Sequence, residues 1–562
     1  MDKRFFLALM LTGAVVVLTP MLFPRPPVAT PVAGPTATTS TTATAATTAA
    51  TATASSAAPA NAPPAAASVP AIVAETISLS NELATLRLST RGATLASAAL
   101  PGYRQLGNRA GEVELAHARE PMLRYRLIAG GDTIALDTVA FTATRQAVEG
   151  RAGVTFAAAV GASRVTVRYE LHADNYLADV SWRAEGLAQP AFLLADLPTG
   201  FASQEADTTE DYRHLAYAMK PLSTGAERVD FRSPDPGERI LQQGPFAWVV
   251  AKNKYFLVGV LAAAGAESPF AEVQVTGAAR VNKVAVRAEA TVIAPLPEAG
   301  IRFELFVGPQ EWERLVAMGR EFENVNPYGG FISGVVQPFA TIVMRALLWM
   351  KRTLQIEYGW ILVIFGVVIR LAMWPLNSRM MRSSIQMQRI APQVQAAQNK
   401  HKGDAEKQRE AVMKVYAEAG VSPFAALSGC LPMLLPMPIL FALFFVFQNT
   451  IEFRGVSFLW LADISLKDPL YILPLAMGAS MFVLSWVGMR NVPPNPQTKM
   501  MAYLMPVIMT VALLNFASGL NLYYAVQNLA ALPQQWLIAN ERAKTAPATA
   551  VVATDGGERK RR

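Results

Sequence analysis

One stretch of the sequence, YGWILVIFGVVIRLAMWPL at residues 358–376, restricts the possible folds more than any other. Its nineteen residues carry a single charge, that of Arg370. With a rise of 1.5 Å per residue, a helix of this length spans roughly 28 Å, which is about the thickness of the hydrocarbon core of a bilayer. The sequence therefore predicts a membrane-spanning helix that holds a permanent cation about 9 Å from its Leu376 end.

Arg370 is unfavourable at this position, because a guanidinium near the centre of a bilayer costs roughly 2.5 to 3.5 kcal/mol on insertion scales. No Asp or Glu occurs inside any other apolar span of the sequence, so an ion pair within the membrane is not expected. We expect instead a water-filled cavity in which the cation is available to a molecule from outside. The alternative is a structural arginine whose side chain reaches the lipid headgroups.

The composition indicates a membrane protein with a large water-soluble part. Of 562 residues, 52% are hydrophobic and 16% are charged, and the mean hydropathy is +0.26. A single cysteine, Cys430, excludes an intramolecular disulfide, and four scattered histidines form no metal site with it. No Walker loop, dinucleotide-binding glycine motif, GxSxG or HExxH is present. We therefore expect no catalytic residues, no metal, no cofactor and no enzymatic activity.

The first 70 residues predict an anchor and a linker. Residues 1–24 contain Lys3 and Arg4, followed by an apolar run that is longer than the core of a secretory signal and lacks a small-residue cleavage site. We expect an uncleaved membrane anchor with a cytoplasmic N-terminus, and a cleaved signal is the alternative. Residues 25–70 are mostly Ala, Thr and Pro, a composition typical of a disordered linker.

Residues 71–326 predict a β domain. Segments such as RVTVRYELHA and IRFELFVG alternate apolar and polar residues, and Gly, Pro, Asn and Asp separate them. This pattern is typical of an antiparallel β-sandwich, and a short helical pattern from Trp312 to Phe322 ends the domain. No cluster of acids, bases or nucleophiles stands out, and Glu205 and Asp207 are predicted to be solvated loop residues.

Helical patterns follow the β domain. Residues 327–355 carry an apolar stripe and predict an amphipathic helix in the membrane interface, with a helix buried against the β domain as the alternative. Residues 356–376 form the second predicted span. Residues 377–421 carry eight Lys or Arg against four Asp or Glu, which predicts a cytoplasmic helical hairpin whose second helix begins at Asp404.

Residues 422–540 contain four further apolar segments, which bring the predicted number of spans to six. The loop between the first two of them carries three acidic and two basic residues, which fits the outer side of the membrane. Six spans place both termini in the cytoplasm, where the basic tail at 541–562 continues the excess of positive charge. The four segments are 427–447, 470–489, 500–516 and 520–538.

Taken in this order, the segments resemble the YidC membrane protein insertase family of Gram-negative bacteria. Weaker similarity extends into the outer domain, as in NKYFLVGV at 253–260, so that only the linker and the tail are not covered. The residues that carry the resemblance are VIRLAMWPL at 368–376, SGCLPMLLPMPI at 428–439, DPLYILPLAMG at 468–478, LMPVIMT at 504–510 and FASGLNLYYAVQN at 516–528.

The resemblance implies a polytopic α-helical protein of the bacterial inner membrane, with a five-helix insertase core and a large periplasmic all-β supersandwich domain. It also implies the function of an insertase and chaperone, which inserts and helps fold inner-membrane proteins through a hydrophilic groove open to cytoplasm and lipid. The implied partners are nascent inner-membrane proteins, the Sec translocon and membrane lipids. The charge of the basic tail fits contact with the ribosome or with anionic lipid headgroups. A single copy is expected to suffice.

By position, the resemblance also implies the residues of the substrate groove. Arg370 supplies the cation, and Leu440 and Ala512 stand where relatives often carry Phe. The residues implied to line the substrate path are Gly366, Arg370, Cys430, Leu431, Pro432, Leu440, Ala512, Tyr524 and Gln527.

Two other functions compete with insertion. In a small-solute secondary transporter, Arg370 would bind an anion, but the sequence offers no membrane carboxylate for a proton relay and no inverted repeat. A membrane-tethered carbohydrate-binding protein is suggested only by analogy with sugar-binding β-supersandwiches. In the insertase, Arg370 is expected to attract an acidic or polar stretch of the incoming chain, while burial of the adjacent apolar segment in lipid drives its release.

Overall fold

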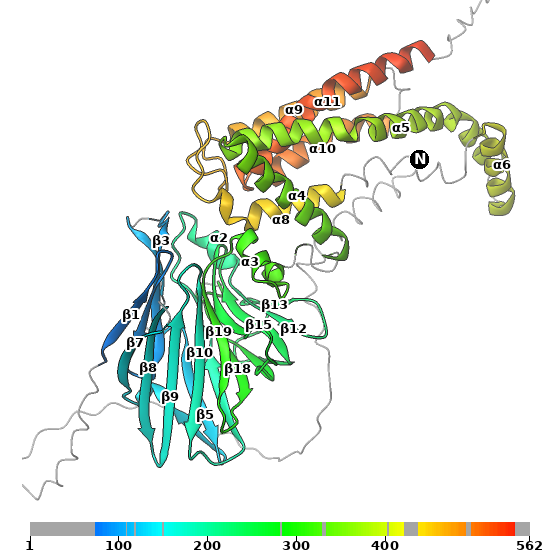
Figure 1. Cartoon of the computed structure of the whole chain (residues 1–562). Coiled ribbons are helices and arrows are strands. Elements are labelled where there is room, and N and C mark those ends of the chain that lie inside the picture. The colour runs from blue at the N-terminus through cyan, green and yellow to red at the C-terminus, as the bar shows by residue number, and fades with distance from the viewer. Residues whose placement is uncertain are drawn as a thin grey trace, which may run out of the picture. The chain divides into compact units, whose positions relative to one another are not determined.

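A computed structural model shows the arrangement of the strands and helices (Figure 1). The predicted anchor at 1–24, the linker at 25–70 and the end of the tail from 546 onward lie outside the described residues, as does the segment 421–436. The structure describes residues 74–107, 110–116, 120–148, 151–281, 284–326, 328, 333–401, 404–420, 437–490 and 496–545.

The β domain consists of three antiparallel sheets, together with a helical turn, α2 (Thr208–Arg213). The first sheet has the order β1 (Thr76–Ser80), β2 (Thr85–Ser89), β3 (Thr94–Arg104), β4 (Glu112–Leu115). The second has the order β13 (Glu227–Asp230), β12 (Ala216–Pro221), β15 (Phe246–Lys252), β16 (Phe256–Ala262), β19 (Ile301–Pro309), β10 (Leu177–Glu185), β9 (Ser163–Leu171), β8 (Arg151–Val160), β7 (Thr142–Val148). The third has the order β14 (Arg239–Gln243), β17 (Glu272–Gly277), β18 (Ala288–Pro295), β11 (Ala191–Asp196), β5 (Arg124–Ala129), β6 (Asp132–Ala135).

The alternation in the sequence accounts for these strands. In β9, Val165, Val167 and Tyr169 are fully buried, whereas the residues between them are partly exposed. The Tyr169 hydroxyl donates a hydrogen bond to the carbonyl of Ala93 at 2.8 Å, so the polar tip of this buried ring is satisfied. The predicted antiparallel β domain is therefore confirmed, and its strands share one hydrophobic core.

Short helices connect the β domain to the rest of the chain. The helix α3 (Trp312–Ala317) and the 3-10 turn η2 (Phe322–Val325) confirm the helical pattern expected after the last strand. They are followed by α4 (Ser333–Leu354), which packs on α8 (Met437–Asn449) and shares a hydrophobic core with it. The stripe of α4 is only partly covered, because Ile342 is 63% exposed. A position of α4 in the membrane interface stays a prediction.

The predicted second span and the first helix of the hairpin form one continuous helix, α5 (Tyr358–Lys400). The expected boundary between residues 376 and 377 is therefore not a break in the secondary structure. The change there from apolar to charged residues marks a change of surroundings, since the Arg, Gln, Met and Ser side chains that follow are all compatible with a helix. The hairpin's second helix is α6 (Ala405–Glu418), and Asp404 caps it by accepting hydrogen bonds from the backbone of Glu406 and Lys407, as predicted.

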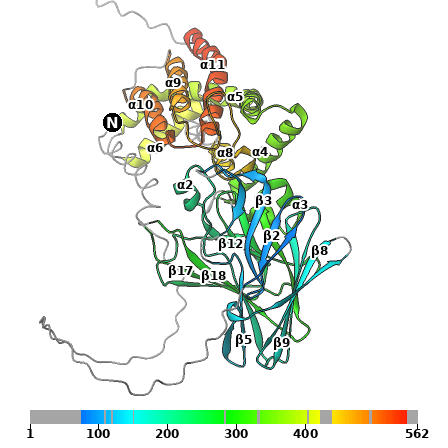
Figure 2. The same ribbon diagram turned by 90° about the vertical axis from the view of Figure 1, so that its left-hand side faces the viewer.

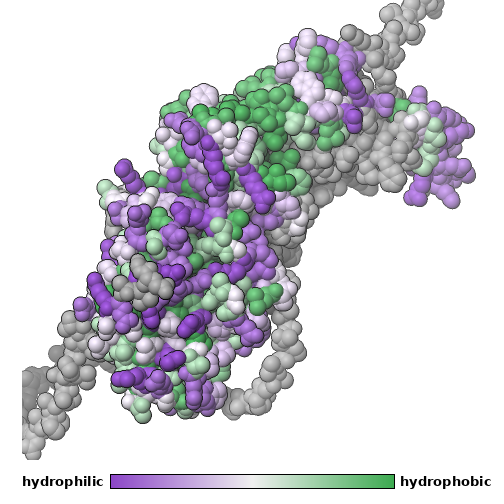
Figure 3. Space-filling model, in the orientation of Figure 1, coloured by the Kyte–Doolittle hydropathy of each residue, from purple (hydrophilic) through white to green (hydrophobic). Residues whose placement is uncertain are grey.

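The C-terminal helices are α9 (Ile472–Gly488), α10 (Pro496–Leu513) and α11 (Ser518–Thr545). The helix α11 packs against both α9 and α5 (Figure 2). Figure 3 shows apolar side chains gathered over the helices, whereas the β domain presents a mainly polar surface. Within the described residues, one helical segment, Tyr358–Arg382, has the length and hydropathy of a membrane span, and shorter apolar helices lie at 472–488 and 499–513. The count of six spans stays a prediction.

A buried ion pair joins the β domain to the segment between α8 and α9. Arg454 donates from Nε to both carboxylate oxygens of Glu205 at 2.9 and 3.0 Å, and the two side chains are only 4% and 6% exposed. The prediction that Glu205 is solvated is therefore wrong, because its partner lies 249 residues away in the sequence. Close by, the Tyr255 hydroxyl donates to Ser465 Oγ at 3.0 Å. The β domain thus contacts the chain just after the C-terminal end of α8.

We expect Arg454→Ala to loosen this attachment. The substitution leaves the Glu205 carboxylate buried without its partner, and losing one member of a buried pair typically costs about 3 to 5 kcal/mol. The thermal unfolding midpoint of the purified full-length protein should fall, and the segment between α8 and α9 should become sensitive to protease. The double variant Arg454→Met with Glu205→Leu should recover much of the loss, because no unpaired charge remains. Equal melting of the single variant and the wild type would contradict this role.

Glu452, which lies close to Arg454 in the sequence, is expected to make the stability of the folded protein depend on pH. Its Oε2 atom is buried and has no hydrogen-bond partner among the described residues, and desolvation raises the pKa of Glu452 to about 7. Burial also raises the pKa of Glu205 to about 7. A carboxyl with a raised folded-state pKa binds its proton more tightly in the folded protein than in the unfolded chain. Stability should therefore fall as the pH rises from about 4.5 through 7.

Glu452→Gln should weaken this dependence and raise the melting midpoint above about pH 7, because the amide carries no charge to desolvate. Melting curves of the full-length protein across the same pH range would measure the effect. Glu298→Gln, at an exposed site in the β domain, is the matched control and should leave the profile unchanged. An unaltered profile for Glu452→Gln would show that its carboxyl does not titrate in this range.

Candidate functional site

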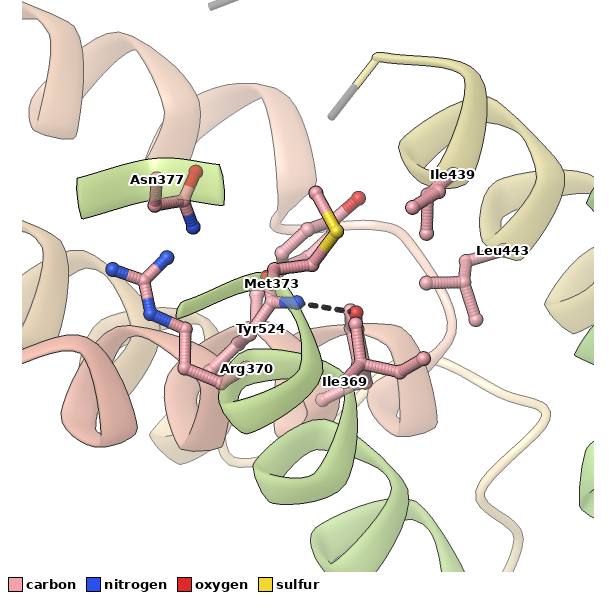
Figure 4. Close-up of a pocket in the computed structure, with 9 residues that line it drawn as sticks. Ile369, Arg370, Met373, Asn377, Ile439, Leu443 and Tyr524 are labelled. Atoms are coloured by element: carbon pink, nitrogen blue, oxygen red, sulfur yellow. Dashed lines mark hydrogen bonds between the residues drawn. The ribbon is translucent and has the colours of Figure 1, made fainter. Parts of the chain in front are cut away.

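Three helices enclose a small cavity around Arg370. Its volume is about 90 Å³, which leaves room for several water molecules. Figure 4 shows the side chains that line the cavity. The helix α5 contributes Ile369, Arg370, Met373 and Asn377, α8 contributes Ile439 and Leu443, and α11 contributes Tyr523, Tyr524 and Gln527.

Helical geometry explains why these residues meet. On α5 the positions 370, 373 and 377 are separated by three and four residues, so their side chains follow one face over two turns. The same spacing applies to Ile439 and Leu443 on α8. Each wall of the cavity is therefore a single face of one helix.

The cavity has a polar end and an apolar end. The guanidinium of Arg370 extends toward Asn377, whereas Ile439 and Leu443 lie on the opposite side, with Met373 between them (Figure 4). Gln527 donates from Nε2 to the Tyr523 hydroxyl at 2.6 Å. An arrangement of this kind suits a chain segment that is polar in one part and apolar in the next.

Arg370 has no carboxylate partner within the described part of the chain, as the sequence predicts. Its Nη2 atom donates to the side-chain oxygen of Gln534 at 2.9 Å. Its Nε atom is buried and has no hydrogen-bond partner among the residues that the structure describes. The charge of the guanidinium is therefore held by a neutral group, and part of its hydrogen-bonding capacity is unused.

The structure brings together some of the predicted site residues. Arg370, Tyr524 and Gln527 line the cavity. Gly366 lies one turn before Arg370 but faces α11, where a Cβ atom would lie 3.3 Å from Val526 and 3.5 Å from Tyr523, so its role is close helix packing. Ala512 is exposed on α10 and does not line the cavity.

The remaining predicted site residues stay untested. Cys430, Leu431 and Pro432 lie outside the described residues, and the same holds for the side chain of Leu440. The neighbours of Leu440 on α8, Ile439 and Leu443, do line the cavity.

Several lining residues escaped the sequence analysis. Ile369, Met373 and Asn377 could have been found by extending the helical spacing from Arg370, because α5 continues beyond Leu376. Tyr523 could have been found from its place beside Tyr524. Gln534 does not line the cavity, but it lies two helical turns beyond Gln527, so the same spacing could have placed it on that face of α11, although not in contact with Arg370.

A second, polar cavity of about 250 Å³ lies on the third sheet of the β domain, between β5, β11 and β18. Two of its four charged residues are paired with each other, because Arg126 donates to both oxygens of Asp196, at 2.8 and 2.6 Å. Among the described residues, no group of three or more His, Cys, Asp or Glu side chains is placed to hold a metal ion.

Comparisons with known proteins give the same assignment for both parts of the chain. The family described as "60Kd inner membrane protein" matches residues 349–545, and the family described as "YidC periplasmic domain" matches residues 76–342. A protein named "Membrane protein insertase YidC" from Anaeromyxobacter sp. (strain K) is 31% identical over 506 residues, covering 84% of this chain and 87% of its own.

A second relative carries the same name, and one solved structure is also similar. The "Membrane protein insertase YidC" from Chlorobium limicola is 27% identical over 490 residues, covering 83% of this chain and 82% of its own. A solved structure titled "Active YidC insertase crystal structure with the first transmembrane domain resolved" is 19% identical and covers 82% of this chain and 92% of its own, with a TM-score of 0.33.

Proposed function

Since the chain belongs to the YidC family of membrane protein insertases, we propose that the cavity at Arg370 is where a segment of a new membrane protein starts to enter the bilayer. The observation that carries this proposal is a partly buried guanidinium next to room for water, with no carboxylate partner among the described residues. We infer the residues that contact the substrate from the lining of this cavity.

The polar end of the cavity attracts the part of the substrate that must cross the membrane. A positive charge in surroundings of low dielectric acts more strongly on an acidic or polar stretch than the same charge in water. Arg370 therefore lowers the free energy needed to draw such a stretch partway into the membrane. Asn377 on α5 and Gln527 on α11 add uncharged hydrogen-bonding groups to the lining of the cavity.

The apolar end favours the next step. Ile439, Leu443 and Met373 offer hydrocarbon contacts to the apolar segment that follows the polar stretch. Each CH₂ group that moves from water into lipid contributes about 0.8 kcal/mol, so a span of ordinary length supplies ample free energy for its own release. Insertion by this route needs no nucleotide.

The remaining features are proposed on the basis of the resemblance and the charge distribution. The protein acts in the inner membrane with its β domain in the periplasm, as one copy, alone or beside the Sec translocon. The hydrophilic groove opens to cytoplasm and lipid, and both termini lie in the cytoplasm. The basic tail, which ends in ERKRR, contacts the ribosome or anionic lipid headgroups.

Arg370→Ala should impair the insertion of substrates with acidic translocated tails, because the attracting charge is lost. A loss of only about 1.4 kcal/mol in the rate-limiting step lowers the rate roughly tenfold. Arg370→Lys should retain most of the activity, since it keeps the charge. Insertion of a single-span substrate with an acidic tail into vesicles that contain equal amounts of each variant is the measurement.

Arg379→Ala is the matched control, because this arginine is exposed on the same helix and does not line the cavity. It should insert the same substrate at the wild-type rate. Wild-type activity of Arg370→Ala at a normal protein level would overturn the electrostatic step.

A further inference from the structure

The side chain of Gln534 lies between α11 and α5 and is almost completely buried, with 1% exposure. Its oxygen accepts the hydrogen bond from Arg370 Nη2 at 2.9 Å. Its nitrogen donates to the backbone carbonyl of Trp374 at 2.9 Å and to the Ser378 hydroxyl at 2.8 Å. One amide thus contacts three successive turns of α5, at positions 370, 374 and 378.

These contacts fix which way the amide points. Both hydrogens of the amide nitrogen are used by acceptors on α5, and a side-chain amide has only two. A flipped amide would direct its N–H groups at the guanidinium, which is itself only a donor, and its oxygen at the carbonyl of Trp374. The flipped form loses these hydrogen bonds, so the oxygen of Gln534 stays directed at Arg370.

The neutrality of this partner matters as much as its position. A carboxylate in the same place would form an ion pair with Arg370 and cancel most of its field. The amide oxygen accepts a single hydrogen bond from a guanidinium that has five N–H groups, and Arg370 Nε is left buried without a partner. The cation is therefore held in place while its charge remains available.

We propose that Gln534 is a positioning residue for insertion: it fixes the Arg370 guanidinium at the polar end of the cavity and leaves its charge uncompensated. The proposal rests on the function proposed above for Arg370. Further along the same two helices, Arg382 and Glu541 form an exposed ion pair at 3.1 Å. The two helices also pack against each other through apolar side chains, so their contact does not depend on the amide alone.

Two nearly isosteric substitutions test the two parts of the proposal. Gln534→Glu adds a carboxylate beside Arg370, and Gln534→Met removes every hydrogen bond of the amide. Gln535→Glu is the matched control, because it places the same new charge one residue along, on the face of α11 that lies against Gly488 of α9. All variants are assayed as full-length protein in vesicles, at equal protein levels.

The readout is the ratio of insertion rates for two forms of one single-span substrate, whose translocated tail carries either two Asp or two Asn residues. A folding defect lowers both rates alike, whereas loss of an available, well-placed cation lowers only the first. We expect Gln534→Glu to reduce the ratio as strongly as Arg370→Ala, about tenfold. We expect Gln534→Met to reduce it about threefold and Gln535→Glu to leave it unchanged.

The outcomes separate this proposal from the one on which it rests. If Arg370→Ala leaves the ratio unchanged, the role of the cation itself is wrong and the positioning role fails with it. If Arg370→Ala lowers the ratio but both Gln534 variants keep the wild-type ratio, the cation acts without this amide and only the positioning role is overturned. An equal loss on both substrate forms for the Gln534 variants likewise overturns it, since that result indicates a structural role.

Discussion

The helical part of the protein depends on how one guanidinium is accommodated among apolar helices. Removing a charge from water is unfavourable by several kcal/mol unless polar groups or water replace the lost solvation. Around Arg370 this replacement comes from a cavity with room for water and from the amide of Gln534. The packing of α11 on α5 makes this contact possible, because the amide reaches Arg370 only if the two helices lie close together. Gly366 permits that approach, one turn before Arg370.

The chain accommodates a second arginine, which is almost fully buried, in the opposite way. Arg454 is paired with Glu205, and both are almost fully buried, so this charge is compensated and serves attachment. The attachment bears on the cavity, because α8 begins near Ile439 and Leu443 and its far end leads directly to Arg454. A helix of 13 residues is about 20 Å long, so fixing its outer end restricts the apolar wall of the cavity at the other. The β domain thus influences the site without lining it.

Features that depend on neighbouring residues could be predicted from local sequence patterns. Contacts between residues far apart in the sequence could not. The strands followed from period-two alternation, and the importance of Arg370 followed from one charge in nineteen residues. The end of the second span was placed at Leu376 because composition changes there, although α5 continues to Lys400. Glu205 was assigned to solvent, because nothing near it in the sequence reveals a partner 249 residues away. Gln534 was missed for the same reason, since it meets Arg370 across 164 residues.

If Arg370 and Gln534 act as proposed, the amide at position 534 is a compromise between stability and function. A carboxylate there would turn the present hydrogen bond from a charged donor into an ion pair, which adds the attraction between two opposite charges. The pair would then resemble Arg454 with Glu205, which is closed to any third group. An apolar residue would leave the guanidinium unheld and the Trp374 carbonyl and Ser378 hydroxyl without this donor. Among these options, only a neutral acceptor that also carries two donors holds the cation and keeps its field available to a passing chain.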